Sequence, residues 1–240
     1  MKTTLTPQSY KSLLLQGNWF SQIPCELADT LLTMADVVSF NAGQSVFLHG
    51  DPKQGLYGVV SGVISIDRQR EDGKEALLAL VEAPNWFGEI TLFDRQQRTH
   101  NARAITDSTL IYISGEALNK LLVTQPQYWQ YLGLLLTSKV RLLMDIVEDL
   151  ALRSTAQRVA KRLVLIAESY GSLKNHSRRV IEVPQEQLAM MLFMTRQTIN
   201  QILKDLARQK LIKLNYGAIE ILDLDALRAF ANHFAPSNSP

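Results

Sequence analysis

The pattern of apolar and polar residues changes twice along this chain of 240 residues. From about residue 37 to residue 113, short runs of β-branched and aromatic residues alternate with glycine, proline and aspartate. Short strands with turn signals about every 8–12 residues are typical of a sandwich or barrel. The clearest predicted strands cover residues 46–48, 56–60 and 63–67, and Asp72-Gly73 is a pair typical of a hairpin turn.

The apolar period becomes helical after this β region. A seam of residues spaced four and three apart runs for about two heptads, as in a coiled coil. It consists of Leu136, Val140, Leu143, Val147 and Leu150. A single helix packed on its own domain would show a similar pattern, but the seam favours pairing between two copies of the chain. We therefore predict a dimerisation helix here.

Helices dominate from Thr155 onward, and a short β-ribbon follows them. We expect helices over residues 157–169 and 185–192, and a third helix that Thr195 caps and that ends near Gln209. Predicted strands cover residues 180–183, 211–214 and 218–222. Two short helices separated by a tight turn and flanked by strands are typical of a winged helix-turn-helix.

The start of the third helix carries side chains that can read DNA. Arg196 can pair with guanine, while Gln197, Asn200 and Gln201 have amides that can pair with adenine. Basic residues that can contact phosphates lie close by, namely Lys204, Arg208, Lys210 and Lys213. A solvated polar face on an ordinary helix pair is the alternative, and the clustering beside a threonine cap favours DNA.

The net charge of +2 hides two unlike halves. Residues 1–124 hold 10 Lys/Arg and 13 Asp/Glu, residues 125–153 hold 3 of each, and residues 154–240 hold 12 and 7. A basic C-terminal segment beside an acidic N-terminal one indicates that the C-terminal part meets a polyanion.

Several classes of protein are excluded or disfavoured. A single cysteine, Cys25, excludes a disulfide framework within the chain and an iron–sulfur cluster held by cysteines of one chain, and the four histidines are scattered. Residues 121–138 carry no charge but contain polar residues and Pro126, so we expect no membrane span. Without a convincing signal peptide or a catalytic motif, we expect a cytoplasmic protein that is not an enzyme and holds no metal.

Three segments resemble the cyclic-AMP receptor protein and FNR (CRP–FNR) family of bacterial transcription regulators. Residues 40–51 and 56–63 resemble the family's β-roll, residues 87–104 its phosphate-binding cassette, and residues 183–206 its DNA-binding motif. The resemblance spans about residues 20–233. It implies an α+β chain with an effector domain over residues 1–124, a dimerisation helix over 125–153 and a winged helix-turn-helix over 154–240.

The resemblance also implies a homodimer that places one recognition helix per subunit in successive major grooves of double-stranded DNA, ~34 Å apart. RNA polymerase is then an implied partner. Thr195, Arg196, Gln197, Asn200, Gln201 and Lys204 are the implied DNA-binding residues. Gln197 and Gln201 replace the receptor protein's acidic residue and second arginine, so we expect an altered operator. Phe193 stands where the turn usually has glycine, and we expect a locally reshaped turn.

Four residues match the family's contacts to a cyclic nucleotide. Gly88 and Arg98 would meet the phosphate with Thr99, and Glu89 would accept from a ribose hydroxyl. Cyclic AMP or another cyclic nucleotide is thus implied as effector, although His100 replaces a small residue and Leu143-Met144 replace the polar pair that touches the base. A different ligand, or none with Glu89 and Arg98 ion-paired, stays open. The alternative function is a nucleotide sensor that acts through protein contacts without DNA.

Overall fold

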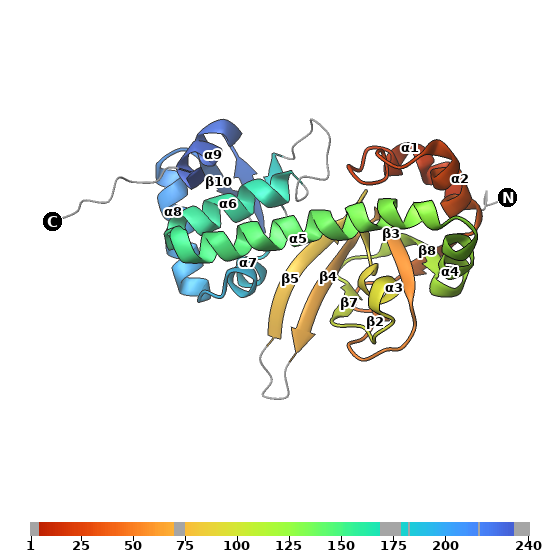
Figure 1. Cartoon of the computed structure of the whole chain (residues 1–240). Helices are drawn as coiled ribbons and strands as arrows, with labels where there is room; N and C mark the ends of the chain where they lie inside the picture. The colour runs from red at the N-terminus through yellow and green to blue at the C-terminus, as the bar shows by residue number, and fades with distance from the viewer. Residues whose placement is uncertain (1–4, 70–74, 169–178, 182, 216, 233–240) are drawn as a thin grey trace. The chain divides into compact units, whose positions relative to one another are not determined.

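The computed structural model describes residues 5–69, 75–168, 179–181, 183–215 and 217–232 (Figure 1). They form two compact units, one up to Val140 and one from Arg141 onward. The boundary falls inside the long helix α5 (Trp129–Leu152), which contributes to both units. The domain boundaries expected after residues 124 and 153 stay predictions.

The first unit contains two antiparallel sheets, each of four described strands. One has the order β1 (Asp36–Phe40), β8 (Ser108–Ser114), β3 (Gly55–Ser61) and β6 (Trp86–Phe87). The other has the order β2 (Ser45–Phe47), β7 (Asn101–Ala104), β4 (Val63–Gln69) and β5 (Glu75–Glu82). The predicted β region is confirmed. The turn predicted at Asp72-Gly73 lies outside the described residues, although β4 and β5 pair as a hairpin would.

Short helices flank these sheets in sequence. They are η1 (Pro7–Tyr10), α1 (Lys11–Leu14), α2 (Cys25–Thr33), α3 (Ile90–Asp94), α4 (Gly115–Thr124) and η2 (Pro126–Tyr128). Only α4 has a side-chain cap among them, because the Ser114 hydroxyl accepts from the Ala117 N–H at 3.2 Å. The cap fixes the point where strand β8 becomes helix.

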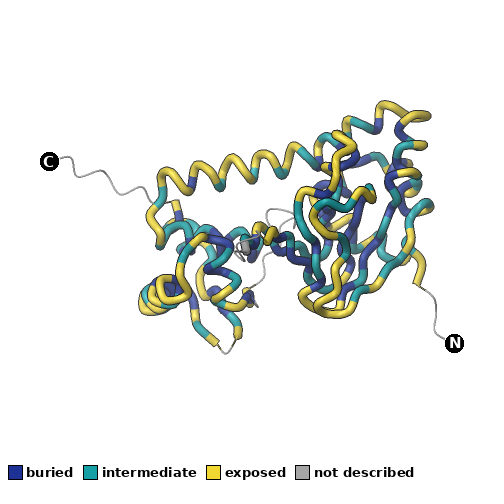
Figure 2. The backbone as a smooth tube through the Cα atoms, turned by 90° about the horizontal axis from the view of Figure 1, so that it is seen from below, coloured by how far each residue is buried: buried dark blue, intermediate teal, exposed yellow. Residues whose placement is uncertain are grey.

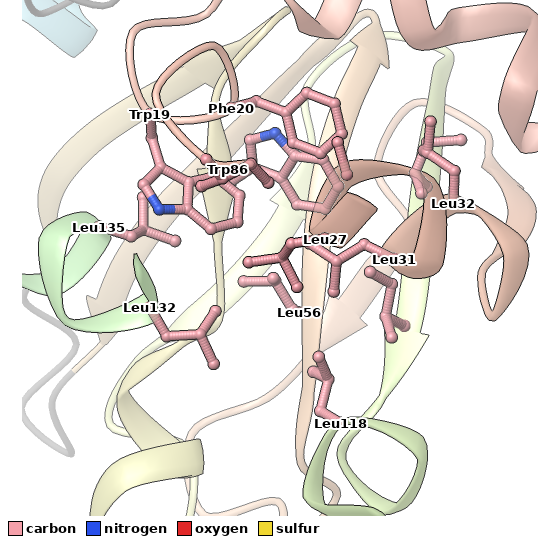
Figure 3. Packing of buried hydrophobic residues seen from close by; sticks show 14 of the residues in the cluster. Trp19, Phe20, Leu27, Leu31, Leu32, Leu56, Trp86, Leu118, Leu132 and Leu135 are labelled. Carbon is pink, nitrogen blue, oxygen red and sulfur yellow. The ribbon is translucent and has the colours of Figure 1, made fainter. Parts of the chain in front are cut away.

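An aromatic cluster joins the N-terminal segment to α5. Phe20 stacks on Trp86 with ring centroids 5.2 Å apart, and Trp19 meets the Trp86 ring edge-on. Leu132 and Leu135 of α5 belong to the same core, which Figure 3 shows from close by. The Trp19 indole donates to the Tyr131 carbonyl at 2.7 Å. Residues 121–138 carry no charge because several of them pack into this core. No described helix is long and apolar enough to cross a membrane.

The second unit consists of helices and a three-stranded antiparallel sheet of order β10, β11, β9. Its elements after α5 are α6 (Thr155–Ala167), β9 (Val180–Ile181), α7 (Gln185–Leu192), α8 (Arg196–Arg208), β10 (Ile212–Asn215), β11 (Ala218–Ile221) and α9 (Leu224–Asn232). Ser154 and Gln157 form a capping box at the start of α6. The predicted helix pair and ribbon are confirmed, and α9 is an addition to the prediction.

Candidate functional sites

Helix α8 presents the residues predicted to read DNA. The Thr195 hydroxyl accepts from the Thr198 N–H at 3.1 Å, which confirms the predicted cap. The inner face is apolar and buried, through Ile199, Ile202, Leu203 and Leu206. The opposite face of α8 is polar and faces solvent. On it Arg196, Gln197, Gln201 and Lys204 are exposed and Asn200 is half-buried.

The turn between α7 and α8 differs from the expectation. Phe193 has φ 55° and ψ 43°, the left-handed conformation that usually selects glycine. The Met194 N–H donates to the Ala189 carbonyl at 3.0 Å, and the Phe193 N–H donates to the Met190 carbonyl at 3.3 Å. The predicted reshaping of the turn is wrong, because these bonds hold Phe193 in the glycine-type conformation with a side chain that is 66% exposed.

Basic residues in the second half of α8 and just after it line one groove. Lys204, Arg208, Lys210 and Lys213 surround an apolar floor of Ala207, Ile212, Leu214 and Leu222 in an open space of about 620 Å³. Arg208 pairs with Asp205, and Lys213 lies 3.7 Å from a Glu220 carboxylate oxygen. A groove with four cations on its rim suits contacts with DNA phosphates.

A second candidate site lies in the first unit, where the loop after β6 meets the loop before β3. Gly88 has φ 95°, and a Cβ on it would lie 2.7 Å from the Gly55 carbonyl oxygen. Glycine is therefore required here for both backbone conformation and close approach. Glu89 is 1% exposed and accepts a hydrogen bond from the Lys139 ammonium at 2.7 Å.

Arg98 lies against the same glycine and is 3% exposed. Its guanidinium donates to the Gly88 carbonyl at 2.8 Å and to the Gly55 carbonyl at 3.0 Å, and it stacks over the Phe47 ring at 4.2 Å. Burial lowers the pKa of Arg98 and raises that of neighbouring Tyr57 to about 12. Arg98 Nε is buried without a hydrogen-bond partner among the described residues. The ion pair of Glu89 is thus with Lys139, and the guanidinium of Arg98 binds two carbonyls instead.

Exposed Thr99 and half-buried His100 lie beside Arg98 in sequence. The Thr99 hydroxyl lies 2.9 Å from His100 Nδ1, so it has a partner within the protein. Burial lowers the pKa of His100, and the nearby Arg68 and His49 lower it further. The other two histidines, His176 and His233, lie outside the described residues.

The predicted dimer seam lies along α5, which Figure 2 shows as largely exposed. Val140, Leu143, Val147 and Leu150 are each 44–57% exposed, and Leu136 is half-buried. Met144 beside the seam is 63% exposed. Such a row of exposed branched apolar residues is typical of a helix that a partner covers.

No group of three or more metal-ligating side chains occurs in the described part of the chain. Cys25 is exposed and free. Two residues that matter at the β-roll site were absent from the sequence-based prediction, namely Lys139 on Glu89 and Phe47 on Arg98. Since Lys139 is 50 positions from Glu89, no local pattern could have paired them.

Comparison with known proteins follows the same division of the chain. Residues 37–125 match the family model of the cyclic nucleotide-binding domain, and residues 157–230 match that of the Crp-like helix-turn-helix domain. A CRP-like cAMP-activated global transcriptional regulator of Mycobacterium tuberculosis is 29% identical over 216 residues, which cover 90% of this chain and 96% of that protein.

The chain belongs to the CRP–FNR family of transcription regulators. A solved CRP/FNR family regulator from Thermus thermophilus is 28% identical with a TM-score of 0.61, covering 82% of this chain and 99% of that one. The c-di-GMP responsive global regulator CLP of Xanthomonas campestris shares the fold at 22% identity, with a TM-score of 0.67 over 83% and 100% of the two chains. This CRP–FNR family regulator combines a β-roll of the cyclic nucleotide-binding type with a DNA-binding helix-turn-helix. Its relatives are regulators and not enzymes.

Proposed function

We propose that this regulator acts in the cytoplasm as a homodimer that binds an operator in double-stranded DNA through α8, contacts RNA polymerase and has no catalytic role. The carrying observation is the outer face of α8, where a capped helix start exposes Arg196, Gln197 and Gln201. Pairing through the exposed seam of α5 would bring two such faces to half-sites ~34 Å apart.

Selection of DNA sites followed by binding of the Arg196→Ala variant tests this proposal. Wild type should enrich an operator that contains guanine at one position per half-site, different from the receptor protein's own consensus. The variant should lose about 1–3 kcal/mol of discrimination at that position. Lys213→Ala is the matched control, because loss of a phosphate contact should weaken all sequences equally. A wild type that binds no DNA fragment, with or without nucleotide, would instead favour the sensor that acts through protein contacts.

We propose further that the β-roll binds a cyclic nucleotide by its phosphate and ribose. The unpartnered Nε of Arg98 and the glycine cradle at Gly88 fit a phosphate, with Thr99 beside Arg98 in sequence, and the buried carboxylate of Glu89 fits a ribose hydroxyl. The ligand would replace the Gly88 and Gly55 carbonyls on Arg98 and compete with Lys139 for Glu89.

The base end of this site offers less selectivity. By the resemblance, Leu143 and Met144 occupy the positions of the polar pair, and neither side chain can donate to a purine. We therefore expect cyclic AMP and cyclic GMP to bind with affinities within about tenfold of each other, which corresponds to about 1.4 kcal/mol. Calorimetry with both nucleotides measures this, and absence of heat at millimolar ligand would reject nucleotide sensing while leaving DNA binding intact.

A further inference from the structure

The second unit contains a partly buried group of cations beside the turn between α7 and α8. A small cavity of about 20 Å³ lies there, between α5, α6 and the end of α7. Its charged lining residues are Arg158, Lys161 and Arg162 of α6 and Asp149 of α5, and its apolar ones include Leu192 and Phe193 of the turn. None of these residues has a role in the proposed DNA contacts, so their arrangement needs a separate explanation.

The single carboxylate that lines this cavity among the described residues is already engaged. Asp149 is largely buried and accepts from Arg153 Nε at 2.5 Å and from Lys161 Nζ at 2.8 Å. Arg158 uses Nη2 to donate to the Leu192 carbonyl at 2.8 Å, which ties α6 to the turn. Four cationic side chains therefore gather around one carboxylate. Asp149 pairs with Arg153 and Lys161, and not with Arg162.

Arg162 is a buried cation with one unpartnered nitrogen in the described part of the chain. It is 5% exposed, and its Nη1 is buried with no hydrogen-bond partner there. Its neighbour Arg158 is also positively charged. The pKa of Arg158 is lowered, first by burial and second by the positive charge of Arg162. A guanidinium removed from water is strongly unfavourable unless an anion or several acceptors compensate it.

We propose that this cavity binds one small inorganic anion of the chloride class. Its small volume suits a single small ion. A water molecule would fit but could supply no negative charge to a cluster with three surplus cations. A bound halide would accept from Arg162 Nη1, offset the repulsion between Arg162 and Arg158, and fix the floor of the turn at Leu192 and Phe193.

Anomalous diffraction and thermal unfolding of the full-length protein test this site. Crystals grown in bromide should show one anomalous peak within hydrogen-bond distance of Arg162 Nη1. Replacing gluconate by chloride at constant ionic strength should raise the unfolding midpoint of wild type by about 3 °C or more. Arg162→Gln should abolish this response, while Arg162→Lys should keep part of it.

Arg141→Gln is the matched control, because Arg141 is an exposed arginine of the same unit. It removes the same charge and should leave the chloride response of wild type unchanged. A bromide map with density only at surface positions, or equal midpoints in chloride and gluconate for wild type, would overturn the site. The bromide map needs no variant, so the proposal stays testable if Arg162→Gln does not fold. Neither outcome bears on whether α8 binds DNA.

Discussion

The ammonium of Lys139 and the carboxylate of Glu89 form an ion pair at 2.7 Å that links α5 to the start of α3. The pair is asymmetric, since the Glu89 side chain is 1% exposed and the Lys139 side chain is 38% exposed. A buried carboxylate depends on its partner more than the partner depends on it. The residue predicted to bind ribose is therefore also the residue that anchors α5, the predicted dimerisation helix.

Replacing Lys139 by methionine should destabilise the first unit. The full effect of leaving a buried charge unpaired is about 3–5 kcal/mol, but water reaches Lys139, so we expect about 1–2 kcal/mol. Chemical denaturation measures this change. Lys120→Met is the control, because Lys120 and Glu116 form a solvent-exposed pair at 2.7 Å whose loss should change stability little. Equal losses in the two variants would contradict the structural role of Lys139.

Gly88→Ala should separate backbone strain from steric contact when it is compared with Gly43→Ala. Both glycines have positive φ, at 95° and 86°, but the added Cβ meets the Gly55 carbonyl at 2.7 Å in one case and nothing within 4 Å in the other. Gly43→Ala should cost about 1–2 kcal/mol for its conformation alone. Gly88→Ala should cost more and should also weaken nucleotide binding, measured by calorimetry. A smaller loss at Gly88 than at Gly43 would show that the cradle is not tight.

The seam on α5 predicts a sharp loss of dimer on adding charge. Leu143→Glu should place a carboxylate in an apolar interface and shift the protein to monomers in sedimentation equilibrium. Asp145→Lys is the control, since Asp145 is exposed on the same helix but is not a seam residue. Asp145→Lys should sediment like wild type. A dimer that survives Leu143→Glu would place the interface elsewhere.

Local patterns predicted most of the fold because each depends on neighbours in sequence. The cap at Thr195, the apolar face with Ile199 and Ile202, and the strand pairs all follow from period and residue type. Helix α9 has no counterpart among the predicted elements, since only Leu227 and Ala231 of it are buried and its apolar signal is short.

The candidate site depended on contacts that no local pattern contains. Gly88 and Arg98 could be chosen from their spacing, but the stacking of Arg98 on Phe47 joins residues 51 positions apart. Burial of Arg98 against two carbonyls depends on how β3 and β6 pair, which periodicity does not specify. The sequence therefore indicated which residues carry chemistry, and tertiary packing decided which partners they have.

Phe193→Gly should stabilise the second unit. The left-handed conformation costs a non-glycine residue about 1–2 kcal/mol, whereas glycine adopts it freely. Because Phe193 is 66% exposed, its removal sacrifices little apolar burial, and we expect a net gain of about 0.5–1 kcal/mol in chemical denaturation. Phe193→Ala is the matched control, since it removes the ring but keeps the strain and should gain nothing. A gain in both variants would assign the effect to the ring, and a loss in both would show that its contacts at the turn outweigh the strain.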